Sequence, residues 1–313
     1  MDPTRLDPLA RSLAERRTVV RTLASLPLVA VATGTERGAI SSAARRQRAR
    51  QPQKMKGKGN CKPACSTGEV CLAGTCARFC DVCASGCLVN AIPLALASAP
   101  PGATVILCPE TFTATINVLK NVTLVGAGAD AVETVLQGSA AVNPVLAVQA
   151  GVTATVRNLT ITGAQSESFG AISNQGNLTL ESVRVVDNQG QNYGGIFNLS
   201  GAALTLTDSL VEGNTSSLPG GGIRSATTGS VTLNNSEIKG NQASRGGGVD
   251  VDIDGVLNLN DKSQITGNTA TESTGQGGGG VFNQGTVTVS GKSKIANNTP
   301  DDCVNANNGE GCP

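Results

Sequence analysis

Apolar and polar residues alternate along the C-terminal two-thirds of the chain in short blocks that recur at a nearly constant spacing. Each block consists of one polar residue between two apolar residues, and an Asn follows it eight or nine positions later. The blocks are Leu178–Leu180 with Asn188, Leu204–Leu206 with Asn214, Val231–Leu233 with Asn241, Leu257–Leu259 with Asn268, and Val287–Val289 with Asn298. Successive Asn residues are 26, 27, 27 and 30 positions apart. Alternation with a period of two predicts a β-strand in each block.

A second strand, led by glycine, precedes each block. These strands are Gly170–Ile172, Gly194–Ile196, Gly221–Ile223, Gly247–Val249 and Gly279–Val281. One repeat therefore contains three short strands separated by turns rich in Gly, Asn and Ser. So short a unit cannot bury its apolar face alone, so we expect coils stacked about 4.8 Å apart, each covering the next. A propeller blade would need about 40 residues, and a leucine-rich repeat would need helices.

The recurrent Asn has a physical role in such a stack. Its side-chain amide can satisfy backbone groups inside a turn and bond the equivalent Asn of the next coil. Asn also tolerates the left-handed backbone conformation that tight turns require. The pattern therefore predicts an all-β parallel solenoid with an Asn ladder, over residues 88–313.

The segment before the regular repeats has its own features. Residues 88–128 include the turn-forming residues Pro100–Gly102 and the apolar runs Val105–Leu107 and Val122–Gly126. With the motifs G-G-I-F-N at Gly194–Asn198 and G-G-V-F-N at Gly279–Asn283, the chain resembles the pectin-lyase-like right-handed parallel β-helix superfamily. Its coils resemble the repeats of bacterial polymorphic outer-membrane proteins. The resemblance implies a right-handed β-helix whose entry segment, residues 88–128, has a short capping helix near Val89–Ala97, a turn at Pro100–Gly102, and then strands. It leaves function open because this fold carries lyases, hydrolases, adhesins and spacers.

Composition supports an elongated repeat. The chain has 39 Gly, five Phe, one Tyr, and neither Trp nor His, so Val, Leu, Ile and Ala must fill the core in thin layers. Residues 1–58 carry 13 Lys/Arg against four Asp/Glu, whereas residues 88–313 carry nine against 17. The acidic body, which lacks a basic stripe, is not expected to bind nucleic acid.

The N-terminus has the pattern of an export signal over residues 1–32. Arg16 and Arg17 precede the short apolar run Leu23–Val31, which closes on the small residues Ala30–Ala32. The run is too short to span a bilayer and resembles a twin-arginine signal, although general secretion and an amphipathic helix are alternatives. Residues 33–60 are predicted to be a basic disordered linker, either a tether or an electrostatic attachment to an anionic surface.

Cysteine usage points to an oxidising compartment. Residues 61–87 are predicted to form a cysteine-rich disulfide module, because zinc would need four thiolates in a chain without His and the spacing lacks two C-x-x-C pairs. We expect every cysteine to be paired: Cys61, Cys65, Cys71, Cys76, Cys80, Cys83 and Cys87 with Cys108 in four disulfides, and Cys303 with Cys312 around the C-terminal tail.

One group of charged residues is a candidate for chemistry. Asp250, Asp252 and Asp254 alternate, so one continuous strand would point them outward and Ile253 inward. Three carboxylates about 7 Å apart could hold Ca²⁺ or contact a glycan. They could equally keep the outer face solvated, with Asp250 above Arg224 as an ordinary ladder ion pair.

Two functions are therefore compared. The first is an exported bacterial, non-catalytic surface module for binding, adhesion or spacing, with polysaccharide or cell-surface components as expected partners. The alternative is a Ca²⁺-dependent polysaccharide lyase that uses Asp250, Asp252, Asp254 and Arg224; without His, the family's hydrolase pattern cannot be completed. The protein is expected to be a monomer, secreted or attached to the cell envelope, with no membrane span in the mature chain and no cofactor other than Ca²⁺.

Overall fold

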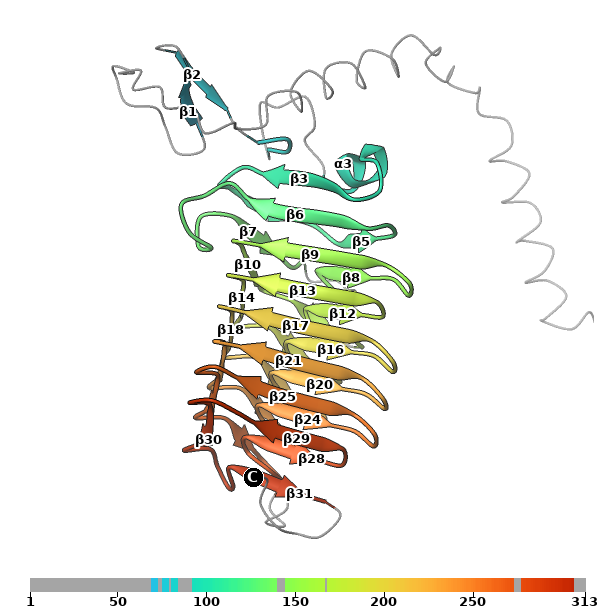
Figure 1. Ribbon diagram of the computed structural model, residues 1–313, viewed down its shortest axis with the longest axis vertical. Coiled ribbons are helices and arrows are strands. Elements are labelled where there is room, and N and C mark those ends of the chain that lie inside the picture. The colour runs from blue at the N-terminus through green and yellow to red at the C-terminus, as the bar shows by residue number, and fades with distance from the viewer. Residues whose placement is uncertain are drawn as a thin grey trace, which may run out of the picture. The chain divides into compact units, whose positions relative to one another are not determined.

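The computed structural model describes residues 69–72, 75–78, 80–83, 92–139, 144–166, 168–272 and 277–306. All of them belong to one compact unit, Gly59–Pro313. From residue 92 onward they form a right-handed parallel β-helix of stacked coils, which confirms the predicted fold class (Figure 1). The predicted export signal and linker lie outside the described residues.

Three long sheets, each of eight parallel strands, run the length of the stack. Sheet I contains β3 (Ala103–Leu107), β6 (Val122–Gly126), β9 (Thr153–Arg157), β13 (Asn177–Glu181), β17 (Ala203–Thr207), β21 (Ser230–Asn234), β25 (Val256–Asn260) and β29 (Thr286–Val289). Sheet II contains β4 (Thr111–Thr113), β7 (Val135–Gln137), β10 (Thr160–Thr162), β14 (Arg184–Val186), β18 (Leu210–Glu212), β22 (Glu237–Lys239), β26 (Gln264–Thr266) and β30 (Lys294–Ala296). Sheet III contains β5 (Ile116–Val118), β8 (Leu146–Val148), β12 (Ile172–Asn174), β16 (Ile196–Asn198), β20 (Ile223–Ser225), β24 (Val249–Val251), β28 (Val281–Asn283) and β31 (Cys303–Asn305).

The chain passes through sheets III, I and II in turn in every coil. In the middle coils it also adds a two-residue strand to a small sheet IV, which the sequence pattern did not predict. Sheet IV contains β11 (Gln165–Ser166), β15 (Gln189–Gly190), β19 (Thr215–Ser216), β23 (Gln242–Ala243) and β27 (Thr269–Ala270). From β7 onward the connections from sheet II to sheet III are the longest, and they carry Tyr193 and Arg245, which contact the outer face of sheet III.

The core consists of columns of like apolar residues. The inward residues of sheet I include Leu178, Leu204, Val231 and Leu257, which pair in register and are at most 1% exposed. Stacking places each side chain on its equivalent in the next coil, which is why a unit too short to fold alone is stable in the stack.

The predicted Asn ladder is present at the turn after sheet II. Asn214 Nδ2 donates to Asn241 Oδ1 at 2.9 Å, and Asn241 Nδ2 donates to Asn268 Oδ1 at 2.9 Å. The ladder ends where Asn298 donates its backbone N–H to Asp302 Oδ1 at 2.8 Å, so Asp302 takes the place of a further Asn. Buried amides are stable only with such partners.

The N-terminal end of the stack is covered. Helix α3 (Ile92–Ser98) buries Ile92, Ala95 and Leu96, close to the expected Val89–Ala97. Before it, the backbone N–H groups of Asp81 and Val82 both donate to Ile106 O, at 2.7 and 3.1 Å, and so cover the free edge of β3. None of the described helices is long and apolar enough to cross a membrane.

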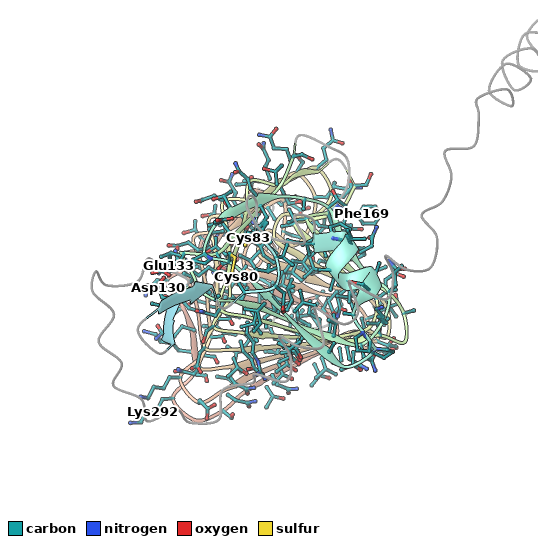
Figure 2. All side chains as sticks on the ribbon, turned by 90° about the horizontal axis from the view of Figure 1, so that it is seen from above. Cys80, Cys83, Asp130, Glu133, Phe169 and Lys292 are labelled. Atoms are coloured by element: carbon teal, nitrogen blue, oxygen red, sulfur yellow. A yellow bond between two sulfur atoms is a disulfide. The ribbon has the colours of Figure 1, made fainter. Side chains whose placement is uncertain are left out.

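The cysteine prediction is tested only in part. Cys80 and Cys108 form a disulfide beside Cys83 (Figure 2), and none of Cys80, Cys83, Cys108 and Cys303 is free. The hairpin of β1 (Glu69–Leu72) and β2 (Thr75–Arg78) aligns the backbones of Cys71 and Cys76. Cys61, Cys65, Cys87 and Cys312 lie outside the described residues.

Candidate functional site

The outer face of sheet III carries buried and half-buried charged residues and most of the aromatic residues that could form a site. The middle residue of each strand points outward, and these residues pair in register from coil to coil. The column is Asn117, Ala147, Ser173, Phe197, Arg224, Asp250, Phe282 and Val304. Although outward, most are buried; Ser173 is 3% exposed and Asp250 is 0% exposed. Side chains from the connections that follow sheet II, such as Tyr193 and Arg245, pack on part of this face.

Four charged residues, Arg224, Arg245, Asp250 and Asp252, form an ion-pair cluster on β20, β24 and the adjoining segments. Arg224 Nη2 donates to both carboxylate oxygens of Asp252, at 3.0 and 2.7 Å, and Arg224 Nη1 lies 3.8 Å from Asp250 Oδ1. Arg245 Nε donates to Asp250 Oδ2 at 2.9 Å. Two cations thus face two anions, and the cluster is neutral as a whole. The predicted position of Asp250 beside Arg224 is confirmed.

Asp250 is the most constrained member of the ion-pair cluster. Burial raises the pKa of its carboxyl group, and the positive charges of Arg224 and Arg245 only partly oppose this shift. Asp250 Oδ1 is buried with no hydrogen-bond partner among the described residues. Desolvation disfavours the ionised form of a buried carboxyl group, so the two arginines hold in place a charge that the site itself disfavours.

Aromatic side chains fill the rest of this part of the face. Tyr193 stacks on Phe197, with ring centroids 3.8 Å apart and an interplanar angle of 18°. The Arg224 guanidinium lies 5.7 Å from the Tyr193 ring centroid, and the Arg245 guanidinium lies 4.4 Å from the Phe282 ring centroid. Both arginine contacts have the geometry of cation–π interactions.

Glycine makes room for the ion-pair cluster. Gly220 stands three residues before β20, the place that Tyr193 takes before β16. It has φ +84°, and a Cβ there would lie 2.7 Å from Arg224 Cβ. An aromatic residue at this position would therefore displace the arginine.

The expected alternation of Asp250, Asp252 and Asp254 along one strand is wrong. Strand β24 ends at Val251, Ile253 is 58% exposed instead of buried, and Asp254 lies in a turn with φ 57°. The chain turns here because it must enter sheet I within five residues, and Asp tolerates the left-handed conformation. Only Asp250 and Asp252 come together with Arg224, and both are paired with arginine.

The described residues hold one convergent set of candidate metal ligands, and it is not this cluster. The sulfur atoms of Cys80, Cys83 and Cys108 lie within 4.8 Å of one another. Cys80 and Cys108 are joined in a disulfide, so their sulfurs do not offer thiolates to a metal.

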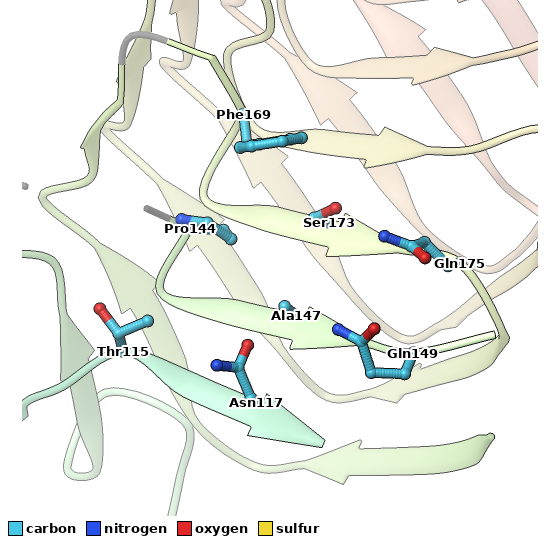
Figure 3. Close-up of a pocket in the computed structure, with 8 residues that line it drawn as sticks. All are labelled: Thr115, Asn117, Pro144, Ala147, Gln149, Phe169, Ser173 and Gln175. Atoms are coloured by element: carbon cyan, nitrogen blue, oxygen red, sulfur yellow. The ribbon is translucent and has the colours of Figure 1, made fainter. Parts of the chain in front are cut away.

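The N-terminal part of the same face is hollowed. The hollow has a volume of about 230 Å³ and is lined by Thr115, Asn117, Pro144, Ala147, Gln149, Phe169, Ser173 and Gln175. Its floor is the in-register row Asn117, Ala147 and Ser173 on β5, β8 and β12 (Figure 3). Pro144 and Phe169 border it on one side, and Gln149 and Gln175 border it on the other (Figure 3). Among the described residues that line it, none has an ionisable side chain.

The polar side chains of the hollow are uncommitted. Within the described part of the chain, Asn117, Gln149 and Gln175 make no side-chain hydrogen bond. Asn174, next to Gln175 but pointing inward, donates instead to Asn198 Oδ1 at 2.8 Å and to Ala203 O at 2.9 Å. Outward amides at the hollow are therefore available to a ligand, whereas inward amides serve the fold.

Sequence reasoning missed the hollow. One feature of the sequence indicated it, namely the small size of Ala147 and Ser173. These residues stand in the column where later coils carry Phe, Arg and Asp. Small outward residues leave space only if the adjoining connection does not fill it, and the sequence pattern did not predict the course of that connection. The chain matches no family model, no curated protein and no solved structure.

Proposed function

We propose that this chain is an exported, non-catalytic β-helix that binds glycans at a cell surface through the outer face of sheet III. One observation carries the proposal. Of six aromatic residues, five Phe and one Tyr, four lie along this face: Phe169, Tyr193, Phe197 and Phe282. Ligand sites combine apolar and aromatic surface with a few convergent polar groups, and sheet III has both.

The ion-pair cluster supports binding over catalysis. Arg224 is held by the carboxylates of Asp252 and Asp250, so its guanidinium is engaged and not available as a base. A Ca²⁺ ion would have to displace an arginine from each carboxylate, and Asp254 lies apart in its turn. The described residues that line the hollow include no acid or base. We therefore favour binding over the lyase alternative. The closeness of Arg224, Asp250 and Asp252 is the observation that supports the lyase.

The proposed compartment is supported by the disulfide. The bond between Cys80 and Cys108 joins the segment before the β-helix to its first coil, and such bonds persist outside a reducing cytosol. We infer that residues 1–32 direct export and that the coils belong to the pectin-lyase-like group they resemble. The mature N-terminus of secreted protein, read by mass spectrometry, tests the first inference; a protein that retains Met1 in the cytosol contradicts it.

Affinity electrophoresis tests the function. The purified full chain is run through gels containing neutral polysaccharides (hydroxyethyl cellulose, galactomannan) or acidic ones (polygalacturonate, alginate), with heat-denatured protein as control. We expect retardation by at least one polysaccharide and no release of unsaturated uronates, with or without Ca²⁺. Uronate release that needs Ca²⁺ and is lost in Arg224→Ala would establish the lyase instead, and failure to bind any polysaccharide would overturn the proposal.

A further inference from the structure

We propose that the hollow is the primary subsite of this face and that it holds an uncharged sugar ring of a neutral glycan. The inference rests on the proposed function and adds to it the position of the site and the charge class of its ligand. It is carried by the hollow's geometry, by its uncommitted amides and by the uncharged side chains of the described residues that line it.

The size of the hollow fits one ring of a longer chain. It crosses β5, β8 and β12, which at the spacing of neighbouring strands spans about 10 Å. Its volume of about 230 Å³ lies below the roughly 300–1,000 Å³ of pockets for whole drug-sized ligands. A glycan would therefore place one unit in the hollow and continue along the face.

The chemistry of the walls matches hydroxyl groups. Each amide offers two N–H donors and one carbonyl acceptor, and a sugar hydroxyl donates and accepts through one oxygen. Gln149 and Gln175 occupy equivalent positions one coil apart, so together they can bond two hydroxyls of one ring. Across the hollow, the half-buried Phe169 side chain adds apolar surface to the lining.

Charge and backbone pairing exclude two other ligand classes. An acidic sugar would place its carboxylate among amides, with no cation among the described lining residues, and desolvating an unpaired charge is costly. An extended peptide would need free backbone groups for strand addition. Strand β8 is paired on both sides, by β5 and β12, so its backbone offers none.

Ser173→Phe is the decisive variant because it fills the hollow with a side chain that this column already accepts. Ser173 pairs in register with Phe197 of the next coil. The matched control is Thr179→Phe, an outward position of sheet I in the same coil. In affinity gels with the best-bound neutral polysaccharide, we expect Ser173→Phe to weaken binding at least tenfold, and Thr179→Phe to leave it unchanged within twofold.

A second variant keeps the test independent of any misfolding of Ser173→Phe. Gln149→Ala with Gln175→Ala removes two amides without adding volume, and each lost hydrogen bond is expected to weaken binding about twofold to tenfold. Asn177→Ala, an exposed polar position on sheet I, is its control. Retained neutral-glycan binding in both hollow variants, or binding restricted to polygalacturonate and alginate, would overturn this inference and leave the proposed function standing. Loss of binding to every polysaccharide in the wild-type chain would overturn both.

Discussion

The outer face of sheet III changes character between β12 and β16. On the N-terminal side the column carries Asn117, Ala147 and Ser173, and on the C-terminal side it carries Phe197, Arg224, Asp250 and Phe282. The two regions share one backbone arrangement and one register. In the C-terminal region large side chains contact one another and residues of the connections from sheet II, so their charges are paired inside the protein. In the N-terminal region small side chains leave a hollow whose amides have no side-chain hydrogen bond to any described residue.

The charged and aromatic residues that stand out in the sequence are not the residues whose polar groups are free to bind a ligand. Charged and aromatic residues attract attention in a sequence, yet here the charged ones satisfy each other. Groups free to bind a ligand are neutral and flank residues as plain as Ala147 and Ser173. Substitutions that convert one region into the other test whether this distinction is real.

Removing the centre of the ion-pair cluster should have the largest effect. Asp250→Ala leaves Arg245 without its carboxylate and Arg224 with one partner fewer, and breaking such a buried pair should lower the free energy of unfolding by about 3 kcal/mol. Urea denaturation of the full chain measures the loss. Asp254→Asn, at an exposed turn position, is the control and should change stability by less than about 0.5 kcal/mol. A loss below 1 kcal/mol in Asp250→Ala would mean that the cluster does not hold this region together.

Replacing a large side chain of the packed region with a small one should have an intermediate effect on the free energy of unfolding. Phe197→Ser copies the residue of the preceding coil and removes the stacking partner of Tyr193. Because Phe197 is only partly buried, we expect a destabilisation of about 2 kcal/mol, below the cost of truncating a fully buried ring. The same denaturation experiment decides the matter. An unchanged midpoint would show that the aromatic stack contributes nothing to packing.

The reverse substitution should be nearly neutral. Ser173→Phe places a ring where space already exists, so the free energy of unfolding should change by about 1 kcal/mol or less, in either direction. The asymmetry between this variant and Phe197→Ser is the sharpest stability test of the comparison. Equal and large losses in both would indicate that both regions are tightly packed.

The smallest effect should be a change in the slope of stability against pH. The pKa of Asp250 is raised in the folded protein, so the folded state binds this proton more tightly than the unfolded state does. Its contribution is fully present below the unfolded value of 3.8 and is lost as pH rises through the folded pKa. The wild-type chain should therefore lose stability relative to Asp250→Asn as pH rises above 3.8. Parallel curves for the two proteins would contradict the shift.

Most of the fold could be predicted from the sequence because the same pattern of residues recurs in successive coils. Five copies of one strand block and one Asn were enough to predict the stacked coils, the buried columns and the bonding of Asn214 to Asn241. Ladder contacts depend only on equivalent positions in neighbouring coils, and these can be aligned by eye.

The candidate site could not be predicted in the same way. Whether Asp254 continues a strand depends on how soon the chain must turn into sheet I, and a run of alternating residues does not specify that. Whether an outward residue is covered depends on the connection from sheet II, whose sequence differs from coil to coil and whose length also varies. The predicted neighbours Arg224 and Asp250 were found together because they share a ladder, whereas Arg245 reaches Asp250 from such a connection and was missed.

Side-chain amide NMR tests most directly whether the amides around the hollow are free to bind a ligand. In ¹⁵N-labelled protein, the side-chain N–H groups of Asn214, Asn241 and Asn268 should be protected from hydrogen exchange, because each bonds the next residue of the ladder. Those of Asn117, Gln149 and Gln175 should exchange as freely as exposed amides, and they should be the side-chain amides that shift when a neutral glycan is added. Protection of the hollow amides equal to that of the ladder, or glycan-induced shifts confined to the residues around Arg224 and Asp250, would contradict the account.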